Sequence, residues 1–519
     1  MKQKLPFLLL PLAATATSCS ETAKEPQRPN YVFILADDLG YGDISYLDDN
    51  SKIRTPHIDK MASESAVFTD AHSSSAVSTP TRYGVLTGRY NWRSTLKNHV
   101  LDGYSKALIK PDRSTIATML GKQGYTTAAI GKWHLGWDWA NIENGVDNID
   151  YSKRVENSPI TRGFDYYYGV CGSLDMPPYV YIENDMPTAV PTRIDERKRT
   201  ESKYGWWRLG PVSPDFVHED VLPNIVSRGC DYIAEKSKGD DPYLLYLPFT
   251  APHTPILPSA EFQGKSGIGD YGDFVLMVDA MVGQVIEAVE RSGEADNTVI
   301  VFTTDNGCSP AAGITEMIEQ GHYPNSIYRG HKADLYDGGH RVPCIVRWSG
   351  TIEPHHVDQT ICLTDFYATF AALSGYELED CEGEDSYDIS SLLLSTEECA
   401  PLREATIHHS QAGDFTIRKG EWKLLMSASS GGWSYPRPGT DNKVIATLPP
   451  IQLYNMSTDP SETKNVYLDH PEIVTELRAI LVKYIKEGRS TPGARQNNDG
   501  PYPWKFLLKW MTDEEIALN

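Results

Sequence analysis

Two polar pairs in this chain stand where a metal ion can be held. Asp37 and Asp38 follow one apolar run, and Asp305 and Asn306 follow another. Carboxylate and amide oxygens form a hard ligand set that suits Ca2+ or Mg2+ rather than zinc. Paired acids after a strand are also common as helix caps, so neither pair on its own establishes a metal site.

A second group of residues surrounds Ser78. It opens the segment Ser-Thr-Pro-Thr-Arg, in which Pro80 suits the first turn of a helix because its missing N–H is no loss there. We therefore expect Ser78 at a helix N-terminus, where free N–H groups and the helix dipole favour an anion. Arg82 lies about one turn further and can face the same anion. The alternative is an ordinary capped surface helix that starts in a Ser- and Thr-rich loop.

Residues 78–89 read Ser-Thr-Pro-Thr-Arg-Tyr-Gly-Val-Leu-Thr-Gly-Arg, which resembles the signature of type I sulfatases. In that family the first residue, Cys or Ser, is oxidised to formylglycine. The resemblance implies that Ser78 is the modified residue. The aldehyde hydrates to a gem-diol, one oxygen attacks sulfur, and the other later expels sulfate as the aldehyde reforms. The resemblance extends over residues 29–493.

Further segments resemble sulfatase motifs and imply roles for their residues. Gly-Lys-Trp-His-Leu-Gly at 131–136 matches the segment whose Lys132 and His134 contact the modified residue and sulfate. The resemblance implies that His134 is the base that collapses the sulfated intermediate. It further implies that His253 and Lys332 stabilise or protonate the leaving alkoxide. Together with Arg82, these cations would face one dianionic transition state, as electrostatic catalysis requires.

The same resemblance implies the cofactors. The expected ligands of one Ca2+, with Mg2+ as the alternative ion, are Asp37, Asp38, Asp305, Asn306 and the modified Ser78. Serine at position 78 implies an anaerobic radical maturase as a partner, because the common aerobic pathway acts on Cys.

Sulfated carbohydrate is the expected substrate, with exo action on a terminal galactose or N-acetylgalactosamine of a host glycan. Ser173 and Asp175 match, loosely, a position where some arylsulfatase-like members contact sulfate. Aromatic and polar loops between the motifs are candidate sugar contacts, although such loops more often pack between domains. These segments are 174–181, 204–207, 408–410 and 489–493, and they include His408 and Arg489.

The elements that position these residues alternate between short β-branched runs and longer amphipathic stretches, a pattern typical of an α/β fold. We expect strands over 31–36, 66–69, 125–130, 243–249, 298–303 and 342–348, and helices over 81–87, 115–123, 219–235, 274–291 and 364–373. Because several polar clusters follow strand ends, they are expected to converge at one edge of the sheet.

The sulfatase resemblance implies the alkaline phosphatase-like fold, a large mixed sheet between helices with a smaller C-terminal antiparallel α+β subdomain. After about residue 375 the sequence becomes irregular, with strands expected over 415–425 and 452–454 and a helix over 471–486. The expected organisation is a signal peptide over 1–19, a tether over 20–29, a catalytic domain over 30–375 and a C-terminal subdomain over 376–519.

The N-terminus is typical of an export signal. Lys2 and Lys4 precede an apolar run over residues 5–16 that is too short to span a bilayer. The residues that end at Cys19 resemble a bacterial lipobox, which implies a lipid anchor at Cys19 and a place in the periplasm or on the outer-membrane surface. The alternative is cleavage after residue 16 and a freely soluble periplasmic protein.

Composition excludes some classes of protein. A formal net charge of -22 argues against nucleic-acid binding, which needs a basic face. The seven cysteines after Cys19 show no CxxC spacing, which argues against a zinc–thiolate cluster. Two functional alternatives stay open: a phosphodiesterase or phosphonate hydrolase of the same superfamily, and an inactive glycan-binding lipoprotein.

Overall fold

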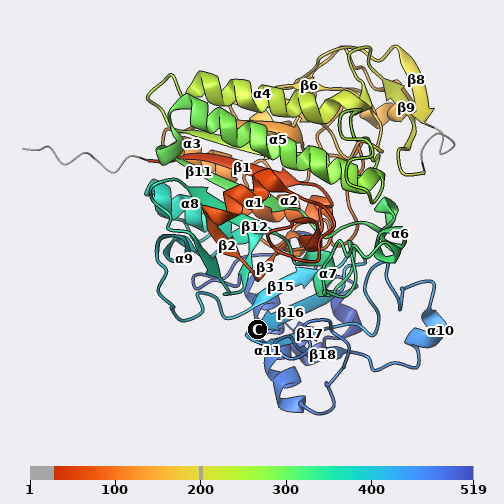
Figure 1. Cartoon of the computed structure of the whole chain (residues 1–519). Helices are drawn as coiled ribbons and strands as arrows, with labels where there is room; N and C mark the ends of the chain where they lie inside the picture. Colours follow the sequence, from red (N-terminus) through yellow and green to blue (C-terminus); the bar gives the residue numbers. More distant parts are fainter. Residues whose placement is uncertain (1–27, 198–202, 518–519) are drawn as a thin grey trace, which may run out of the picture.

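A ten-stranded mixed sheet runs through the middle of the molecule (Figure 1), in the order β13-β2-β12-β11-β1-β10-β4-β5-β6-β7. Its five central strands are parallel: β11 (Thr298–Thr304), β1 (Asn30–Ala36), β10 (Tyr243–Pro248), β4 (Thr126–Lys132) and β5 (Tyr166–Val170). The carboxyl ends of these strands therefore lie along one edge of the sheet. The computed structural model describes residues 28–197 and 203–517.

Shorter strands extend the sheet on both sides. On one side lie β12 (Cys344–Trp348), β2 (Ala66–Phe68) and β13 (His355–Val357), and on the other β6 (Ile182–Glu183) and β7 (Met186–Pro187). Because β12 pairs antiparallel with both β11 and β2, the sheet is mixed rather than wholly parallel.

Helices cover both faces of the sheet, and alternate residues of its strands serve each face. One layer holds α1 (Pro56–Ser63), α4 (Val221–Lys236) and α5 (Asp270–Ser292), and Figure 1 shows α4 beside α5. The opposite layer holds α2 (Ser78–Thr87), α3 (Ile116–Lys122), α8 (Phe366–Ser374) and α9 (Ser390–Leu394). In β1, Val32 and Ile34 join the first core while Tyr31 and Phe33 join the second, as the two-residue period of a strand requires.

A four-stranded antiparallel sheet forms a separate layer toward the C-terminus (Figure 1). It consists of β15 (Thr406–His409), β16 (Phe415–Lys419), β17 (Trp422–Leu425) and β18 (Gln452–Asn455), with α11 (Pro471–Glu487) packed on it. Its core includes Phe415 and Leu481 together with Trp92, which follows the end of α2. The C-terminal sheet thus shares its core with the segment that follows helix α2.

The remaining elements are short. They are β3 (Ala71–His72) paired with β14 (Ile361–Cys362), the pair β8 (Arg193–Arg197) and β9 (Trp207–Val212), and the helices α6 (Ile314–Glu319), α7 (Asp337–His340), α10 (Asn442–Ile445) and α12 (Asp513–Ile516). Among the described residues, no helix combines the length and the apolar character needed to cross a bilayer.

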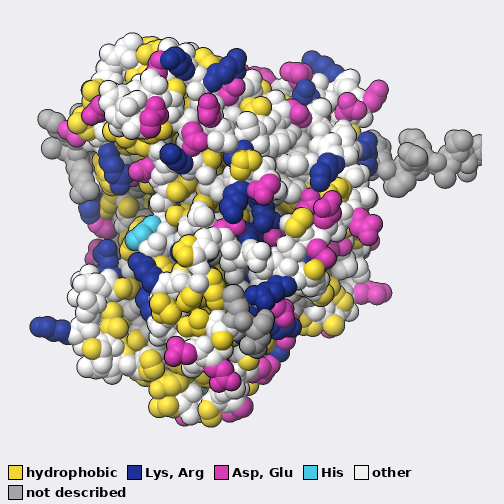
Figure 2. Space-filling view, turned by 180° about the vertical axis from the view of Figure 1, so that it is seen from behind, with side chains coloured by type: hydrophobic (Ala, Val, Ile, Leu, Met, Phe, Trp, Pro, Cys, Tyr) yellow, Lys and Arg dark blue, Asp and Glu magenta, His cyan; other side chains and the backbone are white. Residues whose placement is uncertain are grey.

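The predicted fold class is confirmed, because a large mixed sheet lies between helices and a small antiparallel sheet follows it. The division at residue 375 stays a prediction. The signal peptide, Cys19 and the tether up to residue 27 lie outside the described residues. On the face that Figure 2 shows, acidic and basic side chains are interspersed and do not form one basic surface.

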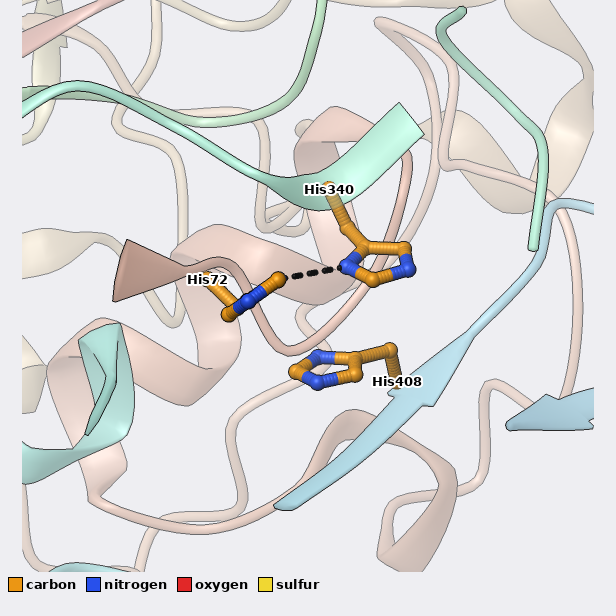
Figure 3. A group of neighbouring side chains, drawn as sticks. All are labelled: His72, His340 and His408. Atoms are coloured by element: carbon orange, nitrogen blue, oxygen red, sulfur yellow. Dashed lines mark hydrogen bonds between the residues drawn. The ribbon is translucent and has the colours of Figure 1, made fainter. Parts of the chain in front are cut away.

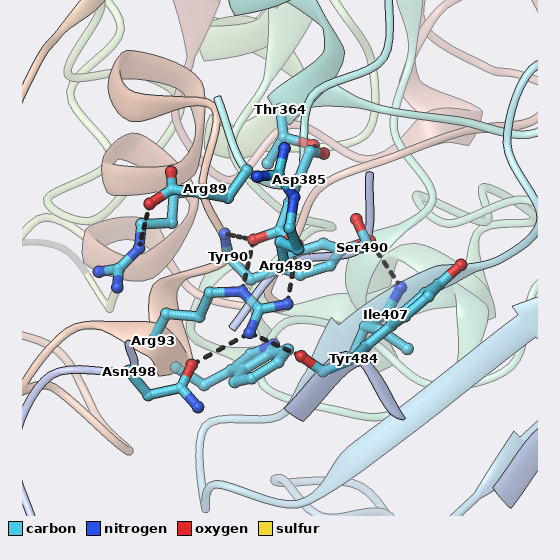
Figure 4. Close-up of polar contacts among 12 residues, drawn as sticks. Arg89, Tyr90, Arg93, Thr364, Asp385, Ile407, Tyr484, Arg489, Ser490 and Asn498 are labelled. Atoms are coloured by element: carbon cyan, nitrogen blue, oxygen red, sulfur yellow. Dashed lines mark hydrogen bonds and ion pairs between the residues drawn. The ribbon is translucent and has the colours of Figure 1, made fainter. Parts of the chain in front are cut away.

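A buried ion pair ties the end of α2 to the C-terminal part of the chain (Figure 4). Arg93 Nε and Nη2 donate to the two carboxylate oxygens of Asp385 at 2.7 and 2.9 Å. Arg93 Nη1 donates to the Tyr484 carbonyl and to Asn498 Oδ1 at 2.9 and 3.0 Å. Asp385 also accepts the Tyr90 N–H at 2.8 Å. Since neither side chain of the ion pair reaches solvent, each charge depends on the other.

Replacing Asp385 by Asn tests this dependence. The substitution preserves the shape of the side chain and leaves the Arg93 guanidinium buried without its counter-charge, so we expect a loss of about 3–5 kcal/mol in the free energy of unfolding. Urea unfolding measures the loss. The control is Glu287→Gln on the surface of α5, whose partner Arg291 is largely exposed, and which should leave the urea midpoint almost unchanged. Equal midpoints for both variants would contradict the role of the buried pair.

Candidate active site

Three carboxylates meet where β1 and β11 end. Ala36 pairs with Thr304 in the parallel register of these strands, so Asp37 and Asp305 emerge side by side. The Asp38 N–H donates to Asp305 Oδ1 at 3.1 Å. Asp37 and Asp305 are fully buried and Asp38 is 2% exposed. The parallel register therefore forces negative charge together in the interior.

Ser78 lies at the first residue of α2 and contacts this cluster. Its hydroxyl oxygen, Oγ, lies 2.6 Å from Asp305 Oδ2 and 3.2 Å from Asp37 Oδ1. Lys132 Nζ lies 3.3 Å from Ser78 Oγ. The Ser78 Oγ stands for the side-chain oxygen that the family's modified residue carries. The expectation that Ser78 begins a helix is confirmed.

Three buried cations compensate the carboxylates. Arg82 Nη2 is 2.8 Å from Asp305 Oδ2, and Lys132 Nζ is 2.7 Å from Asp37 Oδ2. Lys332 Nζ is 2.7 Å from Asp38 Oδ1. Burial opposes the charge on Asp37, yet Lys132, His253 and Arg82 outweigh it and hold the pKa of that carboxyl well below its usual range.

The donor set fits a divalent cation. Asn306 donates through Nδ2 to Asp38 Oδ1 at 2.7 Å and to the Gly307 carbonyl at 2.9 Å, which leaves Asn306 Oδ1 buried without a partner. Burial and repulsion from Asp37 raise the pKa of Asp305, as expected where carboxylates crowd together. Asp37, Asp38, Asp305 and Asn306 therefore offer oxygen ligands of the kind that Ca2+ or Mg2+ prefers.

His134 presents a free basic nitrogen. Its Nε2 lies 2.8 Å from the Leu101 carbonyl, which can only accept, so this nitrogen carries the ring proton. Nδ1 is then a lone pair, and it is buried without a partner. Burial, together with Lys132 and Arg82, holds the pKa of His134 well below its usual range. The ring is thus kept neutral, as a proton acceptor must be.

The cluster opens to solvent on the side of His253 and Lys332. Their side chains are 10% and 8% exposed, whereas those of Arg82, Lys132 and Asp37 are fully buried. His253 Nδ1 lies 2.5 Å from the Thr254 carbonyl, so its Nε2 is the nitrogen that faces Asp38, 3.6 Å away. An anion that enters here meets His253 and Lys332 beside its outermost atoms.

Left-handed backbone marks two of these positions. Asp38 has φ 65° and His134 has φ 56°, values that cost a non-glycine residue free energy unless the surroundings hold it in place. The hydrogen bond from the Asp38 N–H to Asp305 helps to hold the backbone of Asp38 in this conformation. The bond from His134 Nε2 to the Leu101 carbonyl helps to hold His134. Such strain is concentrated at functional sites.

Comparison with known proteins decides among the chemistries that this pocket can perform. The sulfatase family pattern matches residues 29–376, most of the chain. The chain belongs to the sulfatase family. This membership confirms the resemblance drawn from the motifs and the interpretation of the protein as an enzyme.

Individual relatives are similar in sequence to this sulfatase along nearly its whole length. An N-acetylgalactosamine-6-O-sulfatase of Bacteroides thetaiotaomicron is 32% identical over 513 residues, 91% of this chain and 97% of that protein. Arylsulfatase A of Homo sapiens is 29% identical over 502 residues, 92% of this chain and 91% of that protein. A solved structure described under the metabolism of multiple glycosaminoglycans by Bacteroides thetaiotaomicron has a TM-score of 0.78 at 30% identity, covering 88% of this chain and 99% of that chain.

The loop that holds Ser173 and Asp175, two of the predicted substrate contacts, passes beside His134 at Gly172. The loop after β5 carries them, and a Cβ built on Gly172 of this loop would lie 3.5 Å from His134 Cδ2. Ser173 Oγ and Asp175 Oδ1 are buried, and neither has a hydrogen-bond partner among the described residues. The sequence did not single out Arg208, on β9, whose Nη1 binds Asp175 Oδ2 and, at 3.0 Å, the Asp175 carbonyl. No local sequence pattern marks Arg208, because its partner Asp175 lies in a different part of the chain.

His408 and Arg489, the other two predicted substrate contacts, make their hydrogen bonds within the protein. His408 lies in β15 with no exposed surface, and its ring nitrogens lie 2.9 Å from the Ser73 carbonyl and 3.0 Å from Thr406 Oγ1. All three guanidinium nitrogens of Arg489 donate hydrogen bonds to the protein, and their acceptors lie in Asp380 and in residues 491–494. Their role as substrate contacts therefore stays a prediction that these bonds do not support.

The oxygen ligands predict a measurable effect of calcium on stability. Added Ca2+ should raise the thermal midpoint of the wild-type sulfatase, because an ion that binds only the folded state stabilises it. Asp38→Asn keeps the shape of a ligand and removes one negative charge, so this rise should be lost or strongly reduced. Differential scanning fluorimetry across a Ca2+ series measures it. Asp48→Asn, outside the cluster, should respond like wild type; a full Ca2+ response in Asp38→Asn would exclude Asp38 as a ligand.

Proposed function

We propose that this sulfatase removes O-sulfate from a sulfated carbohydrate, by exo action on a terminal galactose or N-acetylgalactosamine. The observation that carries the proposal is the buried cluster at Ser78, in which Arg82, Lys132 and Lys332 pair with three carboxylates and the side chains of His253 and Lys332 reach solvent. The relative named for N-acetylgalactosamine-6-O-sulfate hydrolysis covers nearly the same length and supports the sugar class.

Two groups that the family implies would complete the site. Ser78 converted to formylglycine would supply the nucleophilic oxygen of a hydrated aldehyde. Ca2+, with Mg2+ as the alternative, held by Asp37, Asp38, Asp305 and Asn306 would supply Lewis-acid stabilisation of the sulfate. Lys132 contacts Ser78 Oγ directly, and Arg82 shares Asp305 Oδ2 with that hydroxyl, so both would hold the oxygens of a bound anion in place.

His134 and His253 would each carry out one of the two proton transfers. His134 Nδ1, free and unprotonated, accepts the proton that must leave the modified residue. His253 Nε2, near Lys332 Nζ at the solvent side of the cluster, would face the leaving ester oxygen. Because Nδ1 donates to the Thr254 carbonyl, Nε2 would protonate the alkoxide from a ring that carries a proton on both nitrogens. A sugar alkoxide is a poor leaving group, so this donation contributes most when the substrate is a carbohydrate.

The sugar would be recognised by the loop after β5. Asp175 Oδ1 and Ser173 Oγ have no protein partner, and Arg208 fixes the other Asp175 oxygen. A hydroxyl of the sugar can satisfy the free Asp175 oxygen, and buried polar groups left unpaired would disfavour a sugar that lacks it. The deep burial of the cluster, in which His253 and Lys332 expose only 10% and 8% of their side chains, supports the proposal of a terminal sugar.

We further propose that the sulfatase is exported and lipid-anchored at Cys19, in the periplasm or on the outer-membrane surface, and that an anaerobic serine-type maturase converts Ser78. Sulfated glycans too large to cross the envelope are met outside the cell. The export signal and the serine at position 78 support these two points.

Sulfate release from a panel of substrates tests the function. The modified protein should release sulfate from sulfated galactose or N-acetylgalactosamine, and Lys332→Ala should lower kcat by about a hundredfold or more, because a leaving-group and anion contact is removed. The loss should be smaller with p-nitrophenyl sulfate, whose leaving group needs little help. Inactivity of modified wild-type protein on every sulfated sugar would overturn the proposed substrate class.

The recognition loop predicts a specific defect in sugar binding. Asp175→Asn should lower kcat/KM for the sugar sulfate by about tenfold or more, chiefly through KM, because the recognition contact is lost. Turnover of p-nitrophenyl sulfate, which has no sugar hydroxyl, should change little. Steady-state kinetics with both substrates measures the split. Equal losses of kcat/KM on both substrates would mean that Asp175 positions His134 and does not recognise the sugar.

A further inference from the structure

Three histidines form a second buried cluster outside the catalytic site (Figure 3). His72 comes from β3, His340 from α7 and His408 from β15, and none is more than 1% exposed. The cluster therefore joins the catalytic part of the chain to the C-terminal sheet. It also lies beneath the segment that leads to Ser78, because the Ser73 N–H donates to the His340 carbonyl at 2.8 Å.

Fixed acceptors determine which ring nitrogens carry protons. His72 Nε2 lies 2.9 Å from Asp70 Oδ1, and His340 Nε2 lies 3.0 Å from the Leu335 carbonyl. Asp70 is held ionised, because Arg341 and Arg418 outweigh its burial and lower the pKa of its carboxyl. Both Nε2 atoms must therefore donate, which leaves both Nδ1 atoms as lone pairs in the neutral rings.

These two lone pairs face each other. His72 Nδ1 and His340 Nδ1 are 2.9 Å apart (Figure 3), a separation at which two unprotonated nitrogens repel. A cation is required between them, either a proton or a metal ion. Each ring already donates its Nε2–H to a carboxylate or a carbonyl and presents Nδ1 toward the other ring, the arrangement typical of metal-ligating histidines.

We propose that a divalent transition-metal ion of the zinc class binds between His72 Nδ1 and His340 Nδ1 and crosslinks the two parts of the chain. Imidazole nitrogen is a preferred ligand of such ions, and ligating histidines characteristically donate their other N–H to a carboxylate or a carbonyl, as both rings do here. The ion widens the 2.9 Å separation, because two zinc–nitrogen bonds of about 2.0–2.1 Å at a tetrahedral angle need more room.

His408 is the third ligand of the site after a change of its ring orientation. Its Nδ1 lies 2.9 Å from the Ser73 carbonyl and must donate, so its Nε2 is a lone pair that Thr406 Oγ1 approaches at 3.0 Å. The ring is stacked on that of His340, with centroids 4.2 Å apart and planes at 8°. A metal ion in the plane of one ring cannot lie in the plane of a parallel one, so binding requires the His408 ring to turn.

Surrounding charges leave the site close to neutral before an ion binds. Three acidic and three basic side chains face the cluster from β3, α7, β16, β17 and the segment after β18: Asp70, Asp337, Glu462, Arg341, Arg418 and Lys423. An ion can reach the site, because Asp70 and Thr406, which contact two of the rings, also line a cavity of about 1260 Å³.

Metal analysis of the wild-type sulfatase, purified without a polyhistidine tag, tests the proposal. After treatment with 1,10-phenanthroline in saturating Ca2+ and incubation with Zn2+, mass spectrometry of the eluted metals should find about one zinc ion per chain. His340→Gln and His72→Gln should lose that zinc, whereas His356→Gln, an exposed histidine outside the cluster, should retain it. Asp38→Asn should also retain it, which separates this site from the catalytic one.

A measurement on wild-type protein covers the case in which the variants do not fold. Replacement of zinc by Co2+ should give visible d–d absorption from nitrogen ligands, with saturation at one ion per chain. Absence of stoichiometric zinc together with absence of this absorption would overturn the proposal. Detection by nitrogen-15 NMR of an imidazolium proton between His72 and His340 in zinc-treated protein would also overturn it, because a proton would then occupy the place of the metal.

Discussion

Close packing of three carboxylates in the interior is the constraint on which the rest of the structure depends. The parallel register of β1 and β11 brings Asp37 and Asp305 together, and the bond from the Asp38 N–H to Asp305 draws in the third. Charges this deeply buried are tolerated only when they are paired and hydrogen-bonded. The required partners are three cations: Arg82 on α2, Lys132 on β4 and Lys332 in the segment before α7. Their ion pairs hold these elements around the ends of β1 and β11.

The same constraint explains why the chain encloses helix α2 so completely. Ser78 must remain within hydrogen-bonding distance of Asp305 while Arg82, one turn on, reaches the same carboxylate. All ten residues of α2 are buried, and beyond its end Arg93 is locked to Asp385 among residues of the C-terminal part. The antiparallel sheet thus shares a core with the segment after α2, and the histidine cluster lies at the same boundary between the two parts of the chain.

Much of this arrangement could be predicted from the sequence because the catalytic residues follow strand ends. The apolar runs before Asp37 and Asp305 were recognisable as buried parallel strands, and parallel strands bring their carboxyl ends to one edge. The strand β15 was missed because Thr406–His409 is polar in sequence, and its histidines suggested an exposed loop. Their burial depends on His72 and Asp70, far away in sequence, so no local pattern could reveal it. Likewise, the pairing of Arg208 with Asp175 depends on how β9 packs against a distant loop.

The central claim is that Ser78 is not the working nucleophile until it is oxidised within this pocket. The most direct measurement is the mass of the tryptic peptide that contains Ser78, taken from active protein isolated from the native producer. The account predicts a peptide lighter by two hydrogens than the encoded sequence, in proportion to sulfatase activity across preparations. Fully active protein in which Ser78 is an unmodified serine would contradict the account.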